Sequence, residues 1–211
     1  MIKILIADDH AIVREGLKQI VTEKSGMRVT GEASNYSELF QLLPKNEWDL
    51  IILDIHMPGK NGLEALRDIR QAYPSLPILI LSMYSEEQYG LRSIKAGASG
   101  YLEKVSAPDE LVKAIQKIIS GGKYISSQLT EQMANRLDSN YELQIHESLS
   151  NRELQILCQI ASGKSAEQIA KELIISVHTV YSYRNRILEK MKMKSNVELT
   201  QYAIQNNLIK L

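Results

Sequence analysis

Five polar residues of this 211-residue chain could act together on a phosphate group. Each stands at the end of a short run that is wholly or partly apolar: Asp8, Asp9, Asp54, Ser82 and Lys104. Three carboxylates gathered in a partly buried site repel one another strongly. A divalent cation such as Mg²⁺ relieves this repulsion, and it commonly takes a few carboxylates together with waters and a phosphate. The set therefore predicts a Mg²⁺ site at which a hydroxyl and an ammonium group reach a bound phosphate.

The elements that must bring these residues together are predicted from the hydrophobic pattern. Three runs are almost purely apolar, as strands buried on both faces of a parallel sheet should be: Ile2–Ala7, Leu50–Leu53 and Ile78–Leu81. Two mixed runs, Arg28–Ala33 and Gly100–Lys104, suit sheet edges. Amphipathic stretches of helical period lie between the runs. Right-handed crossovers then favour a flavodoxin-like, doubly wound parallel sheet of order 2-1-3-4-5, whose ligands bind at the carboxyl ends of the strands.

The segment that begins at Asp54 carries a family resemblance. The segment Asp54-Ile55-His56-Met57-Pro58-Gly59-Lys60-Asn61-Gly62 resembles the phosphoacceptor loop of response-regulator receiver domains, Asp-x-x-Met-Pro-x-x-x-Gly. The acidic pair, the hydroxyl residue, the switch aromatic and the lysine of that family also have counterparts here, in Asp8, Asp9, Ser82, Tyr101 and Lys104. The resemblance covers residues 1–120 and implies a receiver domain.

The resemblance to receivers also implies roles for these residues. Asp54 would accept a phosphoryl group from a sensor histidine kinase. Mg²⁺ would be held by Asp9, Asp54 and the backbone carbonyl of His56, with Asp8 acting largely through water. A carboxylate nucleophile, a metal that neutralises phosphoryl oxygens and the compact charge of Lys104 suit this chemistry.

In the same family, phosphorylation is read out by two switch residues. Ser82 would donate a hydrogen bond to the new phosphoryl group and move inward. Tyr101 would then rotate toward the vacated space and bias a surface formed by the fourth and fifth helices and the strand between them.

The middle of the chain, residues 121–147, predicts a connector. Gly121-Gly122 ends the last receiver helix, and Gln128–Leu137 has helical composition. Asp138–Glu147 is polar and predicts a flexible linker, with a domain boundary between about 138 and 148.

The last 64 residues predict a helix-turn-helix. They carry 9 Lys and Arg against 5 Asp and Glu, whereas residues 1–147 carry 16 against 20, so a basic tail follows an acidic front half. Capping boxes begin at Ser150 and Ser165. Ser176 caps a longer helix, Val177 to about Lys192, and a final helix spans roughly Val197–Asn206. A short helix and a long polar one separated by a tight turn make this motif.

The tail resembles the DNA-binding domain of NarL/FixJ (LuxR-type) regulators. The matching text includes Leu149-Ser150-x-Arg152-Glu153, Ile169-Ala170, Ser176-x-x-Thr179-Val180 and Lys190-Met191. The resemblance covers residues 148–211 and implies a four-helix domain. The whole chain then looks like a two-domain regulator of the bacterial cytoplasm. It implies binding to double-stranded promoter DNA, a homodimer formed on phosphorylation or DNA binding, and contact with RNA polymerase.

The long helix of the tail supplies the candidate DNA contacts. The face opposite its apolar residues would meet base edges, and Asn185 could bond bidentately to adenine. Basic residues beside that face would contact phosphates, which position the helix without reading bases. The full set is His178, Thr179, Tyr181, Ser182, Tyr183, Arg184, Asn185, Arg186 and Lys190.

Composition and motifs exclude several other classes of site and function. The single cysteine, Cys158, excludes an intramolecular disulfide and a multi-cysteine zinc site, and no apolar run approaches the ~18 residues of a membrane helix. No Gly-x-Gly-x-x-Gly follows the first strand, which excludes a dinucleotide-binding domain.

Two alternatives stay open. A phosphohydrolase of the haloacid-dehalogenase type also forms an aspartyl phosphate, but its second carboxylate would stand at His56, so turnover should be poor and no turnover enzyme is expected. The other alternative is a helix-turn-helix that binds protein instead of DNA. A salt-dependent gel shift on random duplex DNA would decide between DNA binding and protein binding.

Overall fold

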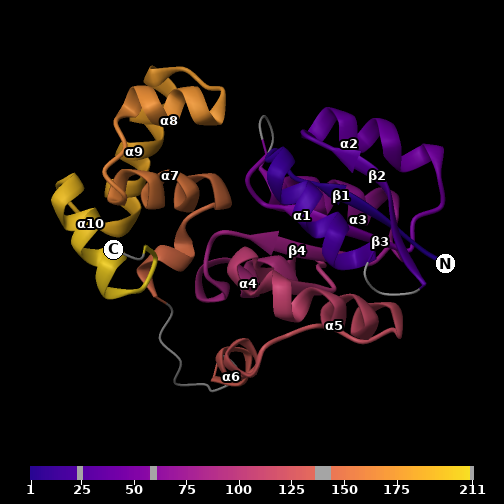
Figure 1. The fold of residues 1–211 in the computed structure, drawn as a ribbon. Coiled ribbons are helices and arrows are strands. Elements are labelled where there is room, and N and C mark those ends of the chain that lie inside the picture. The colour runs from indigo at the N-terminus through magenta and orange to yellow at the C-terminus, as the bar shows by residue number, and fades with distance from the viewer. Residues whose placement is uncertain (23–25, 58–60, 136–143, 210–211) are drawn as a thin grey trace. The chain divides into compact units, whose positions relative to one another are not determined.

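The computed structural model describes residues 1–22, 26–57, 61–135 and 144–209. The chain divides into two compact units, Met1–Met133 and Ala134–Leu211. Figure 1 shows the elements of both in chain order. None of the described helices is long and apolar enough to cross a membrane.

Unit 1 is built on a parallel sheet with the order β2-β1-β3-β4-β5, which confirms the predicted fold class. Its strands are β1 (Ile2–Ala7), β2 (Met27–Ala33), β3 (Leu50–Asp54), β4 (Ile78–Ser82) and β5 (Gly100–Glu103). The two runs of mixed polarity form the edge strands, as predicted. The predicted strands end within one residue of the observed ones, because the backbones of Asp54 and Ser82 still pair with the neighbouring strand.

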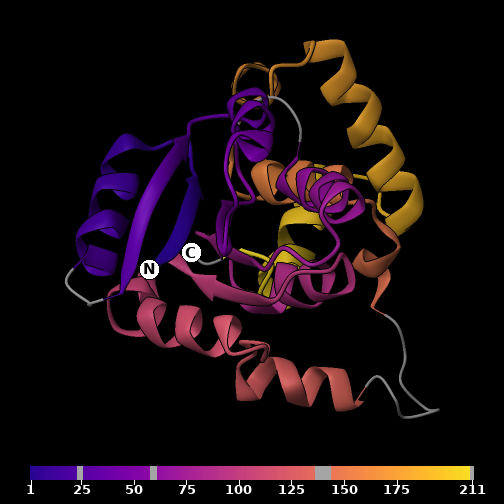
Figure 2. The same ribbon diagram turned by 90° about the vertical axis from the view of Figure 1, so that its right-hand side faces the viewer.

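Helices cover both faces of this sheet. They are α1 (Ala11–Thr22), α2 (Tyr36–Leu42), α3 (Gly62–Ala72), α4 (Glu86–Lys95) and α5 (Ala107–Ile119). The helix α6 (Ser127–Asn135) follows α5, and two short 3₁₀ helices are η1 (Leu43–Lys45) and η2 (Lys104–Ser106). Alternate strand residues such as Ile4, Ile6 and Ile52 form one core with apolar residues of α1 and α5. Figure 2 shows α5 and α6 following one another along one side of unit 1.

The sheet register brings the carboxyl ends of the central strands to one level. Ala7 of β1 pairs with Leu53 of β3, so Asp8 and Asp54 follow paired residues. Ser82 pairs with Glu103, the residue before Lys104. The strand pairing therefore brings Asp8, Asp54, Ser82 and Lys104 to the same edge of the sheet.

Unit 2 contains η3 (Ile145–Ser148), α7 (Asn151–Ala161), α8 (Ala166–Leu173), α9 (Val177–Met191) and α10 (Asn196–Gln205). Both predicted capping boxes are present, at Ser150 with Glu153 and at Ser165 with Gln168. The C-cap of helix α8 is Ile174, whose φ of 54° lies in the left-handed region. Ser176, only two residues later, is the N-cap of α9. Helices α8 and α9 thus form the predicted helix-turn-helix.

The end of the predicted linker differs from the expectation. Residues 136–143 lie outside the described part of the chain, but residues 145–148 form η3 and belong to unit 2. The backbone N–H of His146 donates to the hydroxyl of Tyr202 on α10 at 3.4 Å, and its ring Nδ1 lies 3.0 Å from the same oxygen. The contact joins residues that are 56 positions apart, so the local pattern of apolar residues does not reveal it. For this reason the sequence pattern predicted that these residues belong to the linker.

Candidate functional site

A lysine and two buried carboxylates form the centre of the site at the carboxyl edge of the sheet. The Nζ atom of Lys104 lies 2.6 Å from Oδ2 of Asp8 and 2.7 Å from Oδ2 of Asp54. Asp8 and Asp54 are 1% and 2% exposed. Burial alone would lower the pKa of Lys104, but the two carboxylates outweigh it and hold that pKa above its usual value. The lysine is therefore a fixed cation beside the candidate nucleophile.

The third carboxylate, Asp9, completes the acidic cluster. Burial raises the pKa of Asp9; the charge of neighbouring His10 acts against this shift, while Asp54 and Asp8 add to it. Asp54 and Asp8 raise the pKa of Asp9 because like charges repel one another, as the sequence predicts for this cluster. A cation bound among them would remove that repulsion.

The donor set fits a divalent cation. Single ligand atoms of Asp8, Asp9, His10 and Asp54 all lie within 4.8 Å of one another. Carboxylate oxygens are the ligands that Mg²⁺ prefers. His10 was not singled out in the sequence, although it directly follows the acidic pair; its Nδ1 lies 2.8 Å from Oδ1 of Asp9. The structure therefore supports a metal site made chiefly of oxygen ligands.

His56 and Gly62, which follow β3 in the chain, lie close to Asp54 and Ile55. The N–H of His56 donates to Oδ1 of Asp54 at 3.0 Å, and the imidazole of His56 packs on Tyr84 with ring centroids 4.3 Å apart. A Cβ at Gly62 would lie 2.5 Å from Cα of Ile55 and 2.6 Å from the carbonyl oxygen of Asp54. Only glycine allows α3 to start this close to the backbone of Asp54 and Ile55.

Arg14 is a further residue that sequence reasoning did not identify. It donates from Nη1 to the carbonyl oxygen of Asp8 at 2.8 Å and forms an ion pair with Glu32 of β2 at 3.2 Å. It therefore fixes the backbone from which Asp8 and Asp9 project. The only sequence signal is its position near the start of α1, which lies on the same edge of the sheet.

Ser82 is the last residue of β4, and Tyr101 is the second residue of the neighbouring strand β5. The hydroxyl of Ser82 accepts from the N–H of Tyr84 at 3.1 Å, and the hydroxyl of Tyr101 donates to the carbonyl of Tyr84 at 2.8 Å. Tyr101 is 2% exposed, and burial raises the pKa of its hydroxyl while a hydrogen bond with Ser82 acts against that shift. Tyr101 is therefore already buried in this structure, and its rotation on phosphorylation stays a prediction.

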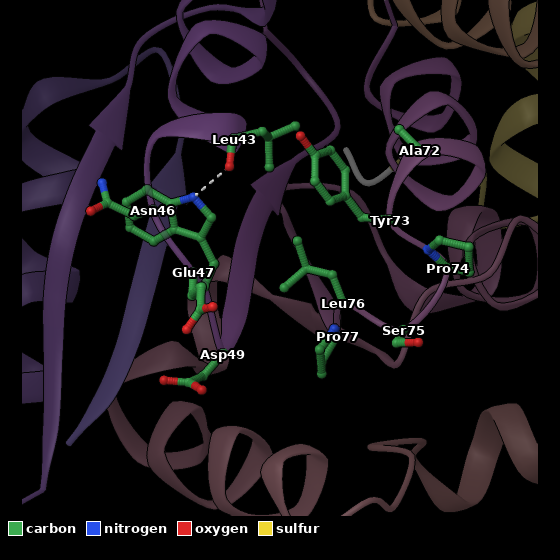
Figure 3. Close-up of a pocket in the computed structure, with 11 residues that line it drawn as sticks. Leu43, Asn46, Glu47, Asp49, Ala72, Tyr73, Pro74, Ser75, Leu76 and Pro77 are labelled. Carbon is green, nitrogen blue, oxygen red and sulfur yellow. Dashed lines mark hydrogen bonds between the residues drawn. The ribbon is translucent and has the colours of Figure 1, made fainter.

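A hollow of about 590 Å³ lies at the opposite edge of the sheet. Its lining residues include those that precede β3 and β4, namely Asp49 and Pro77, and it is bordered by Trp48, whose Nε1 donates to the carbonyl of Leu43 (Figure 3). None of the carboxylates of the acidic cluster lines it. Its place at the amino ends of the strands separates it from the candidate site.

Helix α9 presents the residues expected to face base edges on its surface. His178, Tyr181 and Asn185 are exposed, and Ser182 is half-buried with its hydroxyl donating to the carbonyl of His178. These residues are spaced by three and four positions, so they share one face of the helix. Thr179 stands in the first turn, where its N–H is capped by Ser176.

Two of the residues expected to contact phosphate have partners within unit 2. Lys190 forms an ion pair with Oε2 of Glu153 at 2.7 Å, and Arg184 donates to Oδ1 of Asn196 at 2.6 Å. Burial alone would raise the pKa of Glu153, but Lys190 and the N–H of Ser150 outweigh it and hold that pKa below its usual value.

Arg186, by contrast, is exposed. Its guanidinium lies 5.9 Å from the ring centre of Tyr183, a cation–π contact within α9.

Comparisons with known proteins agree with both units. Residues 4–116 match the family described as response regulator receiver domain, and residues 147–203 match bacterial regulatory proteins of the luxR family. The response regulator UvrY of Escherichia coli strain K12 is 38% identical over 209 residues, which are 99% of this chain and 96% of UvrY.

Solved structures of RcsB are similar over nearly the whole chain. RcsB from Salmonella enterica serovar Typhimurium, bound to promoter rprA with the phosphomimetic BeF₃⁻, aligns with a TM-score of 0.67 and 27% identity, covering 96% of this chain and 98% of that one. A structure of two RcsB dimers bound to two parallel DNAs aligns with a TM-score of 0.60 and 26% identity, with the same coverage.

The acidic receiver fold and the helix-turn-helix together define a DNA-binding response regulator of a two-component system, which controls transcription. Within that class the chain belongs to the NarL/LuxR-type family. Such regulators are not turnover enzymes, so the phosphohydrolase alternative is set aside. The domain limits expected from the sequence, 1–120, 121–147 and 148–211, stay predictions.

Proposed function

We propose that Asp54 accepts a phosphoryl group from a sensor histidine kinase and that this transfer controls the binding of unit 2 to promoter DNA. The observation that carries the proposal is the ion pair of Lys104 with both Asp54 and Asp8. In the transfer, the bond from phosphorus to the imidazole nitrogen of the donor breaks and a bond to a carboxylate oxygen of Asp54 forms. Lys104 places a positive charge where the phosphoryl oxygens arrive.

The proposed cofactor is Mg²⁺, held by Asp9, Asp54 and the backbone carbonyl of His56, with Asp8 acting largely through water. When bound, the metal supplies positive charge to the phosphoryl oxygens. The residues of the chain do the rest: Asp54 attacks, Lys104 neutralises charge, and Ser82 donates a hydrogen bond to a phosphoryl oxygen. Arg14 keeps the backbone of Asp8 in place during the transfer.

The exposed rim of the site supports a protein phosphodonor. Ile12, Met83 and Val105 are 83%, 75% and 78% exposed. Met83 directly follows Ser82, Val105 directly follows Lys104, and Ile12 lies three residues after Asp9. A kinase that brings a phosphohistidine to Asp54 has to contact this rim, and exposed apolar side chains favour such an interface.

The proposed DNA interface is the exposed face of α9. His178, Tyr181, Ser182 and Asn185 would meet base edges, while Arg186 would contact phosphate. Thr179, Tyr183, Arg184 and Lys190 would lie at the margin of the interface, with Arg184 and Lys190 retaining their partners inside unit 2.

The proposed assembly on DNA is a homodimer of the tails through α10. Val197 and Ile204 lie seven residues apart on one face of this helix and are 75% and 37% exposed. Such a pair would read two half-sites. The chain would work in the bacterial cytoplasm and would contact RNA polymerase at the promoter.

Phosphorylation mapping tests the central residue of this proposal. The protein is incubated with a small phosphodonor and Mg²⁺, and its mass and peptides are measured. One phosphoryl group is expected, on Asp54, and it should be absent without Mg²⁺ and in Asp54→Asn. An Asp54→Asn protein that is still modified at the same rate would overturn the assignment.

A further inference from the structure

The connector helix α6 packs on α4 within unit 1. Ser126 donates from Oγ to Oε2 of Glu86, and Gln128 donates to Glu87. A Cβ at Gly90 would lie 3.0 Å from Cδ2 of Leu129, which is 1% exposed. The missing side chain at position 90 thus makes room for Leu129. We call the surface formed by Glu86, Glu87 and Gly90 the connector seat.

Ser126 joins the start of α6 to this seat. Its Oγ accepts from the N–H of Leu129 at 3.0 Å, which caps the helix, and the same hydroxyl donates to Glu86. Burial raises the pKa of Glu86, and the hydrogen bond from Ser126 acts against that shift. A single hydroxyl therefore both begins the connector helix and fastens it to α4.

The residues before α6 are held against the end of the sheet. The N–H of Tyr124 donates to the carbonyl of Ser99 at 2.9 Å, and the carbonyl of Tyr124 accepts from the N–H of Tyr101 at 3.3 Å. The hydroxyl of Tyr124 donates to Glu110 of α5. The connector is thus attached both to β5, which carries Tyr101, and to the first turns of α4.

Hydrogen bonds of Ser82, Tyr84 and Glu86 hold the segment between β4 and α4, which joins the candidate site to the connector seat. The hydroxyl of Ser82 accepts from the N–H of Tyr84, and the carbonyl of Tyr84 accepts from Tyr101. Two residues on, the N–H of Glu86 donates to Oε1 of Glu103 at 3.0 Å. The segment from Ser82 to Glu86 is therefore held by Ser82 at one end and contributes Glu86 to the seat at the other.

We infer that the connector seat is a docking surface for α6, which is occupied before phosphorylation and vacated when Asp54 carries a phosphoryl group. The inference rests on the proposed function of Asp54. When Ser82 turns to donate to the phosphoryl group, its hydroxyl shifts relative to the N–H of Tyr84, which donates to it in this structure. The segment that leads into α4 then repacks and moves Glu86 away from Ser126.

Hydrogen exchange of the full-length protein, followed by mass spectrometry, tests this inference. Peptides covering residues 127–135 should exchange at least about tenfold faster once Asp54 is fully phosphorylated, since a helix that has left its packing surface opens more often. Asp54→Asn treated with the same phosphodonor should exchange like the untreated protein. The extent of modification is read from the same samples by intact mass.

Two variants address the seat itself without phosphorylation. Gly90→Leu fills the place of Leu129 and raises the helix propensity of α4, so α4 should remain helical while residues 127–135 exchange faster. Leu129→Ala removes the side chain that occupies the seat and should act in the same direction. Glu131→Gln, at an exposed position of α6, is the matched control and should exchange like the wild type.

The outcomes separate this inference from the proposed function. Complete modification of Asp54 with unchanged exchange of residues 127–135 would overturn the release of α6 and leave Asp54 as the phosphoacceptor. Exchange unchanged in both Gly90→Leu and Leu129→Ala would overturn the seat. Absence of modification at Asp54 would overturn the proposed function, and this inference with it.

Discussion

The acidic site and the exposed face of α9 are built in opposite ways. At the acidic site, the side chains of Asp8, Asp54 and Lys104 are almost completely buried, and Lys104 forms an ion pair with each carboxylate. On α9, His178 and Asn185 are exposed. A buried cluster is fixed by the fold, because each charge needs its partner, whereas a surface that reads DNA has to leave its side chains accessible. Arg184 and Lys190 of α9 differ from these exposed residues, because each has a partner within unit 2.

The largest effect is expected where the acidic site depends on backbone packing. Gly62→Ala would push a methyl group to within 2.5 Å of the backbone of Ile55 and Asp54. We expect a loss of about 3 kcal/mol in the free energy of unfolding of unit 1, measured by urea denaturation, because backbone gives way less readily than side chains.

Gly16→Ala is the matched control, since nothing lies within 4 Å of a Cβ built there. It should leave stability unchanged or raise it by up to about 1 kcal/mol, through better helix propensity in α1. Equal stabilities of Gly62→Ala and Gly16→Ala would contradict this account of Gly62.

The next effect concerns the division of α9 into residues that contact bases and residues that contact phosphates. Asn185→Ala should relax base preference at one position in each half-site by about 1–3 kcal/mol, and Arg186→Ala should weaken binding to all sequences alike and lower the salt dependence. Selection from a random DNA library, followed by salt titrations, measures both. Identical profiles for the two variants would show that this division is wrong.

A smaller effect distinguishes Lys190 from Arg186. Lys190→Met should lower the free energy of unfolding of unit 2 by about 1 kcal/mol, because it leaves Glu153 without its ion pair while Lys190 itself is partly exposed. Lys171→Met, at an exposed position of α8, is the control and should have no such effect. Wild-type stability combined with weakened DNA binding would assign Lys190 to DNA instead.

The ion pair of Lys190 with Glu153 makes the stability of unit 2 depend on pH, and the sign of this dependence follows from the pKa of Glu153. The pKa of Glu153 is held below its ordinary value, so the stabilisation is present above the ordinary glutamate pKa of about 4.3 and is lost as the pH falls through the lowered pKa. The stability difference between wild type and Lys190→Met should therefore vanish on acidification. A difference that persists at pH 2 would have another cause.

The fold and the acidic cluster could be predicted because they follow from local patterns. Purely apolar runs mark the central strands, and parallel pairing then has to bring the residues after Ala7 and Leu53 to one edge. The capping boxes at Ser150 and Ser165 likewise lie within four residues of sequence.

What the sequence could not supply are contacts between side chains far apart in the chain. The ion pair of Lys190 with Glu153 spans 37 residues, and nothing in the period of α9 distinguishes Lys190 from a lysine that faces DNA. The buried position of Tyr101 depends on the carbonyl of Tyr84, and the room for Leu129 depends on Gly90. Such pairings are set by the packed fold and not by local spacing.

The most direct test of coupling between the two units is a gel-shift titration on two DNAs. One carries a single half-site and the other carries two, and each is titrated with phosphorylated protein, unphosphorylated protein and Asp54→Asn. Phosphorylation is expected to strengthen binding to the two-half-site DNA more than to the single half-site, because paired tails gain from effective concentration. Ser82→Ala should reduce that gain while Asp54 is still modified. Equal gains on the two DNAs, or a gain in Asp54→Asn, would contradict control of DNA binding by pairing of phosphorylated chains.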